Sequence, residues 1–428
     1  MRFASLIGLL VALALAVTSH TWAQGEPAVP FLLYPPSIEA NGMGGNGTAL
    51  TSDDALAPLH NPGHLGLFGL NGFLSGGFYT PATDWLPQFG ISGLQYNVWA
   101  VNAGLKLNTF VALPFDFSLA LGYSSINLDL GQFIITGPGG PTPIGTFESF
   151  EKCNSFTIGV GFEYLIRLGL GMSFKSIESN LSPVGTEQEQ GSGRAEVTAR
   201  DYGLIVGLPL VRTIEDLGSC SLEILPKVKP LVDLTFSYAR SNVGNSVIYI
   251  DAQQADPLPR LASLGLCLEL GAGSTIVGGD WKIISLKFSN EAQQLLIDRL
   301  SDGSWRYISG MGDLGLFDNV IGGNSSSRIW VRKGWQLQAA EALYIRGGTY
   351  TSASVTYETS GLGIQLSGLL KILLVVEPSL REGSWIKFLA DNLDVQFETA
   401  KYSASSSAVS RTTYQGLNIV LRHNLFLK

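Results

Sequence analysis

The feature that most constrains this chain is a strict alternation of large apolar side chains with small or polar ones. It runs from Phe156 to Tyr164 and recurs from Leu168 to Lys175. Successive side chains of a β-strand point to opposite faces, so each segment would form a strand with one apolar face and one thin, wettable face. The polar face is rich in Gly, Ser and Thr, whereas a soluble sandwich usually presents long charged side chains to water. This pattern predicts a barrel with a lipid-facing wall and a crowded, hydrated lumen.

Composition separates the two architectures that 428 residues allow, namely two soluble domains or one barrel of about 14 strands. Only 14% of the residues are charged, against about a quarter in soluble domains, and glycine is abundant. The mean hydropathy is +0.23 although no long apolar helix is apparent. Composition therefore favours the barrel. The net charge of −8 excludes nucleic acid as a partner, because that binding needs clustered Lys and Arg.

The first 23 residues predict export. Arg2 supplies a positive start, residues 6–17 an apolar stretch, and Thr21-Trp22-Ala23 a cleavage site, as in a secretory signal peptide over residues 1–23. The apolar stretch is too short to span a membrane, and no other run approaches roughly 18 to 20 apolar residues. Export without a helical anchor leaves the periplasm, the outside of the cell, or an outer membrane entered as strands. The alternating pattern favours the bacterial outer membrane, with its lipid around the strands.

Residues 72–428 predict an all-β, 14-stranded antiparallel transmembrane β-barrel. An even strand number is what a closed bacterial barrel requires. The expected strands are 72–80, 91–107, 116–130, 154–164, 167–178, 195–208, 228–241, 259–271, 280–289, 328–337, 341–350, 354–367, 392–403 and 414–427.

Connection lengths support this count, because such barrels alternate short periplasmic turns with longer external loops. The tight connections at 165–166 and 338–340 fall on one side. The longer ones fall on the other side, at 131–153, 179–194, 242–258 and 290–327. Residues 368–391 would be an enlarged periplasmic connection that includes a short amphipathic helix, and the long connection 209–227 falls on the same side.

Six charged residues occupy positions that would face the lumen: Glu163, Lys175, Asp233, Glu269, Lys287 and Glu398. Both signs occur, so opposite charges could pair across the interior. They would either solvate and bridge a water-filled barrel or form a selectivity ring.

Residues 24–71 lack sustained alternation and predict an N-terminal plug in the lumen. Glycines between Gly42 and Gly47 permit positive φ and tight turns in a confined space. Ser52 would cap a short helix beginning at Asp53, with the Asp53 and Asp54 carboxylates on its first turn. Pro62 would push Asn61 out of the helical region and end that helix. The plug is either static or a hatch that moves for a ligand.

Three motifs in this segment resemble a known family: Asn41-Gly42-Met43-Gly44-Gly45, then Asp53-Asp54, then Asn61-Pro62. They are similar to the PorV/PorQ proteins of type IX secretion, within the superfamily of FadL-like long-chain fatty-acid channels. Lys333-Gly-Trp335, residues 343–348 and residues 359–364 resemble a hairpin of the same superfamily. The chain departs from the family pattern at Gly63-His64.

The resemblance implies two functions. A PorV-like barrel would receive secreted proteins that carry C-terminal signal domains and pass them, with other secretion components, to surface attachment. Residues 131–153 and 290–327 would then form the contact surface. A FadL-like barrel would instead be a passive channel for a hydrophobic small molecule. A purely structural barrel is the third possibility.

Catalytic, cofactor and metal sites are not expected. Residues 42–47 match G-x-G-x-x-G formally, but no strand precedes them. His60 and His64 are four residues apart, yet the intervening Pro62 and Gly63 break the helical geometry that a shared metal would need. No nucleophile elbow surrounds them, so the chain is not expected to be an enzyme. Cys153 and Cys220 could form a disulfide, or these two and Cys267 could be isolated thiols.

Overall fold

The computed structural model describes residues 27–85, 87, 93–136, 142–183, 192–250, 255–277, 281–353, 355–381, 383–404 and 412–423. The expected signal peptide over residues 1–23 lies outside these residues. Among the described residues, no helix is long and apolar enough to cross a membrane.

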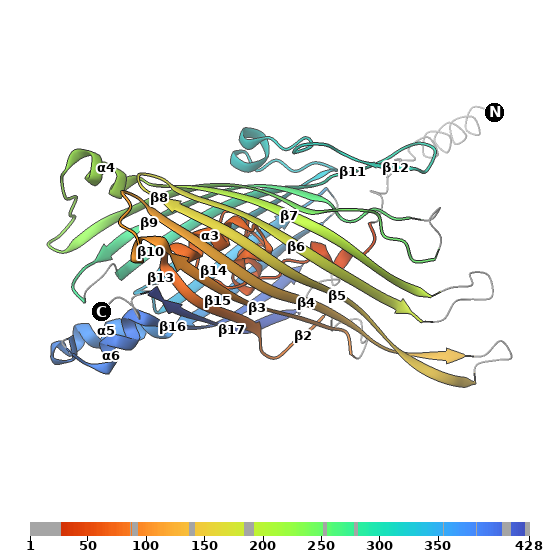
Figure 1. Cartoon of the computed structure of the whole chain (residues 1–428), viewed down its shortest axis with the longest axis horizontal. Coiled ribbons are helices and arrows are strands. Elements are labelled where there is room, and N and C mark those ends of the chain that lie inside the picture. Colours follow the sequence, from red (N-terminus) through yellow and green to blue (C-terminus); the bar gives the residue numbers. More distant parts are fainter. Residues whose placement is uncertain are drawn as a thin grey trace, which may run out of the picture.

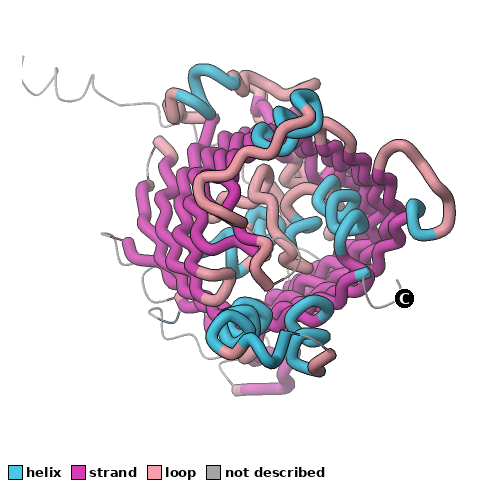
Figure 2. The backbone as a smooth tube through the Cα atoms, turned by 90° about the vertical axis from the view of Figure 1, so that its left-hand side faces the viewer, coloured by secondary structure: helices cyan, strands magenta, loops and turns pink. Residues whose placement is uncertain are grey.

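Fourteen strands close into a ring, which confirms the predicted barrel (Figure 2). Every neighbouring pair is antiparallel, and β1 closes the ring by pairing with β17 on one side and β3 on the other. The short strand β2 (Thr83–Asp84) pairs with β3 outside this count. The ring strands are β1 (Gly72–Tyr79), β3 (Gln95–Lys106), β4 (Asp116–Thr136), β5 (Pro143–Glu163), β6 (Arg167–Ser182), β7 (Gly193–Pro209), β8 (Val228–Gly244), β9 (Leu261–Ser274), β10 (Trp281–Leu295), β13 (Ile329–Ala339), β14 (Leu343–Thr351), β15 (Thr356–Gln365), β16 (Leu393–Ala404) and β17 (Thr413–Arg422).

The strands alternate in burial as their sequence alternates. On β5 the outward Phe156 is 43% exposed and the inward Thr157 is 4% exposed. Such outward residues form what we call the apolar belt, which includes Trp99, Val101, Leu119, Leu121, Phe156, Ile158, Leu170, Phe288, Ile345, Leu362 and Ile364. A closed ring pairs every strand edge and presents this belt outward, which is how strands span a bilayer. The chain thus has the architecture of a membrane-spanning β-barrel.

The two ends of the barrel differ (Figure 1). The turn end carries the tight connections at 164–166 and 340–342, the turn η4 (Leu107–Thr109), and three helices with a short 3-10 turn between the last two. The helices are α4 (Leu210–Gly218), α5 (Leu366–Val376) and α6 (Trp385–Asn392), and the turn is η7 (Pro378–Arg381).

The loop end carries the hairpin of β11 (Ile297–Arg299) and β12 (Trp305–Tyr307). The π-helix η6 (Leu316–Ile321) follows this hairpin and packs on β9, β10 and β13. The tip of the β4–β5 hairpin also lies at this end and reaches past the neighbouring strands (Figure 1). The expectation of a loop over 131–153 was wrong for most of its length, because β4 continues to Thr136 and β5 begins at Pro143.

Residues 27–71, which we call the inner segment, lie inside the ring (Figure 2). They form η1 (Pro30–Leu33), α2 (Ile38–Gly42), η2 (Ala57–Leu59) and α3 (Gly63–Asn71). Helix α3 packs on β4, β5 and β6. A Cβ added at Gly66 would lie 2.1 Å from the Val160 carbonyl oxygen, and one at Gly161 would lie 2.1 Å from that of Gly66. The face of these strands that carries small residues was predicted to be hydrated. It is instead covered by the backbone of α3, which can approach so closely only because the residues at the contact are glycines.

Two local predictions in the inner segment were wrong. No helix begins at Asp53; instead the Asp54 carboxylate accepts a hydrogen bond of 2.9 Å from the Leu56 amide and shapes a turn before η2. Pro62 does not end a helix but precedes α3, and the Asn61 side-chain oxygen accepts a 2.9 Å bond from the Gly63 amide at its start. Competition from local side-chain hydrogen bonds explains both outcomes.

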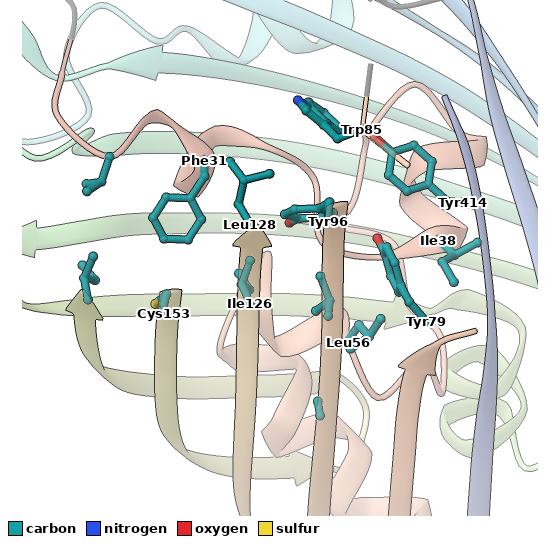
Figure 3. Packing of buried hydrophobic residues seen from close by; sticks show 14 of the residues in the cluster. Phe31, Ile38, Leu56, Tyr79, Trp85, Tyr96, Ile126, Leu128, Cys153 and Tyr414 are labelled. Carbon is teal, nitrogen blue, oxygen red and sulfur yellow. The ribbon is translucent and has the colours of Figure 1, made fainter. Parts of the chain in front are cut away.

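An aromatic and aliphatic core fills the lumen toward the loop end (Figure 3). The Tyr79 ring lies edge-on to both Tyr96 and Tyr414, with centroids 6.0 Å apart in each case. Phe31 and Ile38 bring apolar side chains from the inner segment into the same cluster. Cys153 lies there as a buried free thiol, and Cys220 and Cys267 are also unpaired, so the disulfide is not formed.

Candidate functional site

The candidate site is the contact between the inner segment and the barrel wall, and at its centre lies one buried arginine. Arg346 on β14 binds Glu39 of α2 at 3.2 Å and Glu398 of β16 at 2.6 Å. Its side chain is 1% exposed and both glutamates are 5% exposed. Gly361 stands opposite Arg346 on β15, and its missing side chain lets α2 approach the wall at Gly42. Burial at this depth makes each of these charges dependent on its partner.

The glycine turn that follows α2 is bound to the wall by its backbone. Gly44 and Gly45 have φ of 77° and 78°, which only glycine adopts freely. The Gly44 amide donates to the Thr359 hydroxyl at 2.7 Å, and the Arg332 guanidinium donates to the Gly45 carbonyl at 2.5 Å. Met43 is fully buried beside these residues.

After this turn, charged side chains of β10 form hydrogen bonds with the backbone of the inner segment. The Glu291 carboxylate accepts hydrogen bonds from the amides of Gly47 and Thr48 at 2.9 and 2.8 Å. Lys287 donates to the Thr51 carbonyl at 2.6 Å. These side chains replace the water that an open loop would otherwise bind.

The remaining predicted residues of the segment also contact the wall or hold its turns. The Asn41 side-chain amide donates to the Pro35 carbonyl at 3.0 Å. Arg422 of β17 binds Asp53 at 2.8 Å. The Ser37 hydroxyl donates to Asp54 at 2.5 Å. Pro62 packs against β6 and β7, where a Cβ at Gly171 would meet its carbonyl oxygen at 2.1 Å.

The inner segment contacts each of the fourteen strands. Helices α2 and α3 together pack on β1, β3 to β7 and β14 to β17. Asn61 reaches β8 through the Tyr238 carbonyl, and Ala49 lies against Gly265 of β9. Glu291 and Arg332 complete the ring of contacts on β10 and β13. Because the attachments surround the segment, loosening one strand leaves the others in place.

The six predicted lumen residues are brought into three separate groups rather than one ring. Arg167 at the turn end binds Glu163 at 2.9 Å and Asp233 at 3.0 Å. Asp233 lies opposite Glu269 in register, and Glu269 lies opposite Lys287 and binds Lys282 at 2.7 Å. Lys175 forms its own buried pair with Asp201 at 2.6 Å, and Glu398 belongs to the Arg346 cluster. Opposite charges thus pair mainly with neighbours on the wall.

Burial changes the ionisation of the inner segment. It raises the pKa of Asp54 to about 6, and the nearby Glu39 charge adds to this rise. It also lowers the pKa of His60 to about 3 and that of His64 to about 4, so both imidazoles are neutral at pH 7. His64 Nε2 lies 3.0 Å from the Gly47 carbonyl oxygen.

A hollow in the wall was not predicted from the sequence. The pairing of β7 with β8 is irregular between Arg200 and Tyr202, and Asn242 opposite has a φ of 58°. The hollow has a volume of about 740 Å³, and both inward and outward residues line it, among them Lys175, Ser155 and Phe174. The Arg200 guanidinium lies 5.8 Å from the Phe174 ring centroid at its edge. An irregularity in strand pairing does not change the alternation of apolar and polar residues, so the sequence pattern does not reveal it.

A second unpredicted feature is an exposed apolar patch at the loop end, which we call the loop-end apolar surface. Phe133, Ile134 and Ile144 stand out near the tip of the β4–β5 hairpin, and Ile144 is 69% exposed. Phe317 and Ile321 are also exposed, but they belong to η6, which packs on β9, β10 and β13. β4 and β5 have 21 residues each, whereas β3 has 12. The seven residues of β4 beyond Asp129, its last partner on β3, carry the hairpin tip roughly 23 Å along the strand direction, beyond the apolar belt.

No protein-family model matches the chain, and no curated protein matches it. Several solved structures are similar in part. The toluene transporter TbuX of Ralstonia pickettii is 12% identical, covers 92% of this chain and 98% of that chain, and has a TM-score of 0.38. The Pseudomonas putida toluene transporter TodX is 10% identical, with coverage of 90% and 96% and a TM-score of 0.36. The beta domain of the Bordetella autotransporter Brka is 8% identical, with coverage of 82% and 99% and a TM-score of 0.35.

Proposed function

We propose that this barrel acts in type IX protein secretion as PorV-like proteins do. It would receive secreted proteins with C-terminal signal domains at its loop end and pass them to surface attachment. The observation that carries the proposal is the loop-end apolar surface. Exposed Phe133, Ile134 and Ile144 lie beyond the apolar belt, so lipid does not cover them. Exposed apolar patches outside the bilayer are typical of protein contact sites.

The filled lumen favours the same function. The inner segment is bound to strands around the whole ring, and its central charges are buried and paired. In the proposed function the barrel is a membrane-anchored platform, and the inner segment is a static plug that keeps its wall rigid. Cargo then docks outside the barrel and does not pass through it.

The test is to disrupt the hairpin patch in the native bacterium. Phe133→Ser, Ile134→Ser and Ile144→Ser together should leave cargo with C-terminal signal domains in the periplasm. The matched control is Gln132→Ser with Glu148→Gln on the same hairpin, which removes a polar contact and leaves the patch intact. Heat-modifiable migration in gels would verify that both barrels are folded in the outer membrane. Normal cargo secretion by the folded triple variant would refute the proposal.

The wall hollow favours a second candidate, a passive FadL-like channel for hydrophobic small molecules. Its lining combines Phe156 and Phe174 from the outer face with Ser155 and Lys175 from the inner face. An apolar molecule with a polar end would find both kinds of contact there. Cells that make the barrel should then take up radiolabelled oleate faster than cells without it, and Ser155→Trp, which fills the hollow, should abolish the difference. Equal uptake by all three strains would refute this candidate.

A further inference from the structure

Three helices at the turn end carry apolar faces that no described part of the chain covers. On α4 the exposed apolar residues are Leu210, Ile214 and Leu217. On α5 and α6 they are Leu366, Leu369, Ile372, Leu373, Val376, Trp385 and Phe388. Val376 is 73% exposed and Leu217 is 70% exposed. In Figure 1 α4 lies above the barrel and α5 and α6 lie below it, all at the same end.

The polar face of α4 is turned toward the barrel rim. Arg212 binds Glu163 at 2.6 Å, and the Thr213 hydroxyl donates to the Leu165 carbonyl at 2.7 Å. Glu215 binds Lys229 at the start of β8 at 3.0 Å. Residues 210, 214 and 217 recur at helical spacing on the other side of the helix. The helix is therefore held with its apolar row pointing away from the barrel axis.

The α5–α6 hairpin is fixed to the rim in the same manner. Lys371 of α5 binds Glu341 in the β13–β14 turn at 2.5 Å, and Lys387 of α6 donates to the Val277 carbonyl at 3.2 Å. Leu374 and Ala390 pack with Trp281 and Val277 in a small core beneath the hairpin. The covered side thus contains the polar contacts and the core, and the remaining side is apolar.

Both apolar faces continue the apolar belt without a break. β15 ends at Gln365 and α5 begins at Leu366, so the outward row Leu362, Ile364 and Leu366 passes directly into the helix. β7 ends at Pro209 and α4 begins at Leu210, which again has the outward parity of its strand. Since the belt contacts lipid, the surface that extends it at the end of the barrel meets the same leaflet.

We propose that α4 and the α5–α6 hairpin lie in the headgroup–acyl boundary of the phospholipid leaflet at the turn end. Each helix would bury its apolar row in that leaflet while its polar side stays bound to the barrel rim, as interfacial amphipathic helices do. Trp385 on the exposed face is the residue type that favours this boundary. The two elements would fix the depth and tilt of the barrel from opposite sides.

The test measures whether lipid or water surrounds the exposed rows. In full-length protein carrying Cys220→Ser, with Cys153 and Cys267 left buried, single cysteines at Val376 and Leu217 take a nitroxide label in nanodiscs that hold one copy each. Leu362→Cys in the apolar belt is the lipid control. Asp216→Cys is the matched water control, because it is exposed on α4 and lies outside the apolar row.

Labels at 376 and 217 should collide more with oxygen than with a water-soluble nickel chelate, as the label at 362 does, whereas the label at 216 should show the reverse. Labels at 376 and 217 that follow the pattern at 216 would overturn the proposal. Heat-modifiable migration of every labelled protein would establish that the barrel is folded.

Discussion

Removing the charge of Arg346 should loosen the inner segment far more than removing the whole charged cluster. Arg346→Met leaves Glu39 and Glu398 without their shared partner, and all three side chains are nearly inaccessible to water. Breaking a buried pair by removing one partner costs about 3 to 5 kcal/mol. The hydrogen bonds between the fourteen strands remain intact, so the loss of free energy weakens the packing of α2 against β14 and β16.

Amide hydrogen exchange measures this packing directly. The Asn41 amide bonds to the Ser37 carbonyl at 3.0 Å and the Met43 amide to the Ala40 carbonyl at 2.9 Å, so both exchange only when α2 opens. At about 1.4 kcal/mol per tenfold change, their exchange in Arg346→Met should be roughly a hundred to several thousand times faster. The amides of belt strands far from the cluster serve as internal controls.

A triple variant tests whether unpaired charge is the cause of the faster amide exchange in α2. Adding Glu39→Gln and Glu398→Gln to Arg346→Met removes every stranded carboxylate, and complete replacement of a buried ionic group is often close to neutral. Exchange at Asn41 and Met43 should return to within about tenfold of the wild type. Wild-type protection in Arg346→Met, or equally fast exchange in the single and triple variants, would refute the reasoning.

Two further predictions concern the inner segment. Burial raises the pKa of Asp54 to about 6, above its value of about 4 in an unfolded chain. Protonation of Asp54 therefore favours the state in which the inner segment is packed against the wall. The hydrogen-exchange protection of the segment should fall as pH rises from about 4 to about 6 and then level off. Asp54→Asn should remove this pH dependence, and an unchanged profile would contradict the assignment. Gly66→Ala would place a Cβ 2.1 Å from the Val160 carbonyl oxygen, so the barrel should unfold at lower temperature in a heat-modifiability assay, by an amount equivalent to about 1 to 3 kcal/mol. The control is Gly76→Ala, whose nearest neighbour would be 3.9 Å away, and equal melting of the two variants would count against the packing argument.

The strand number and most strand positions could be predicted because one period of two residues controls them. Alternation in β5 and β6 reflects a physical boundary between lipid and interior, and it ends where that boundary ends. This is why residues 131–153 were predicted to be a loop: Phe133 and Ile134 are adjacent apolar residues on a hairpin that extends past the neighbouring strand β3. Outside the membrane the two faces of a strand no longer differ in environment.

The inner segment could be predicted as a region but not as a structure. Helix α3 contains three glycines in nine residues, and its own sequence favours no helix. It forms because the glycine faces of β5 and β6 admit its backbone, a long-range condition that local sequence does not contain. Arg346 and Glu39 are 307 positions apart, and their pairing follows from barrel closure. The hollow beside Arg200 depends on one irregular register between two strands and was equally hidden.

The direct passage from α3 to β1 has a consequence for assembly. Helix α3 ends at Asn71 and β1 begins at Gly72, and β1 is the strand that joins the last strand of the chain to β3. The strand that closes the barrel is thus continuous with the inner segment that fills it. We therefore expect closure of the ring at β1 to bring the end of α3 to the barrel wall, which would couple barrel closure to the placement of the inner segment.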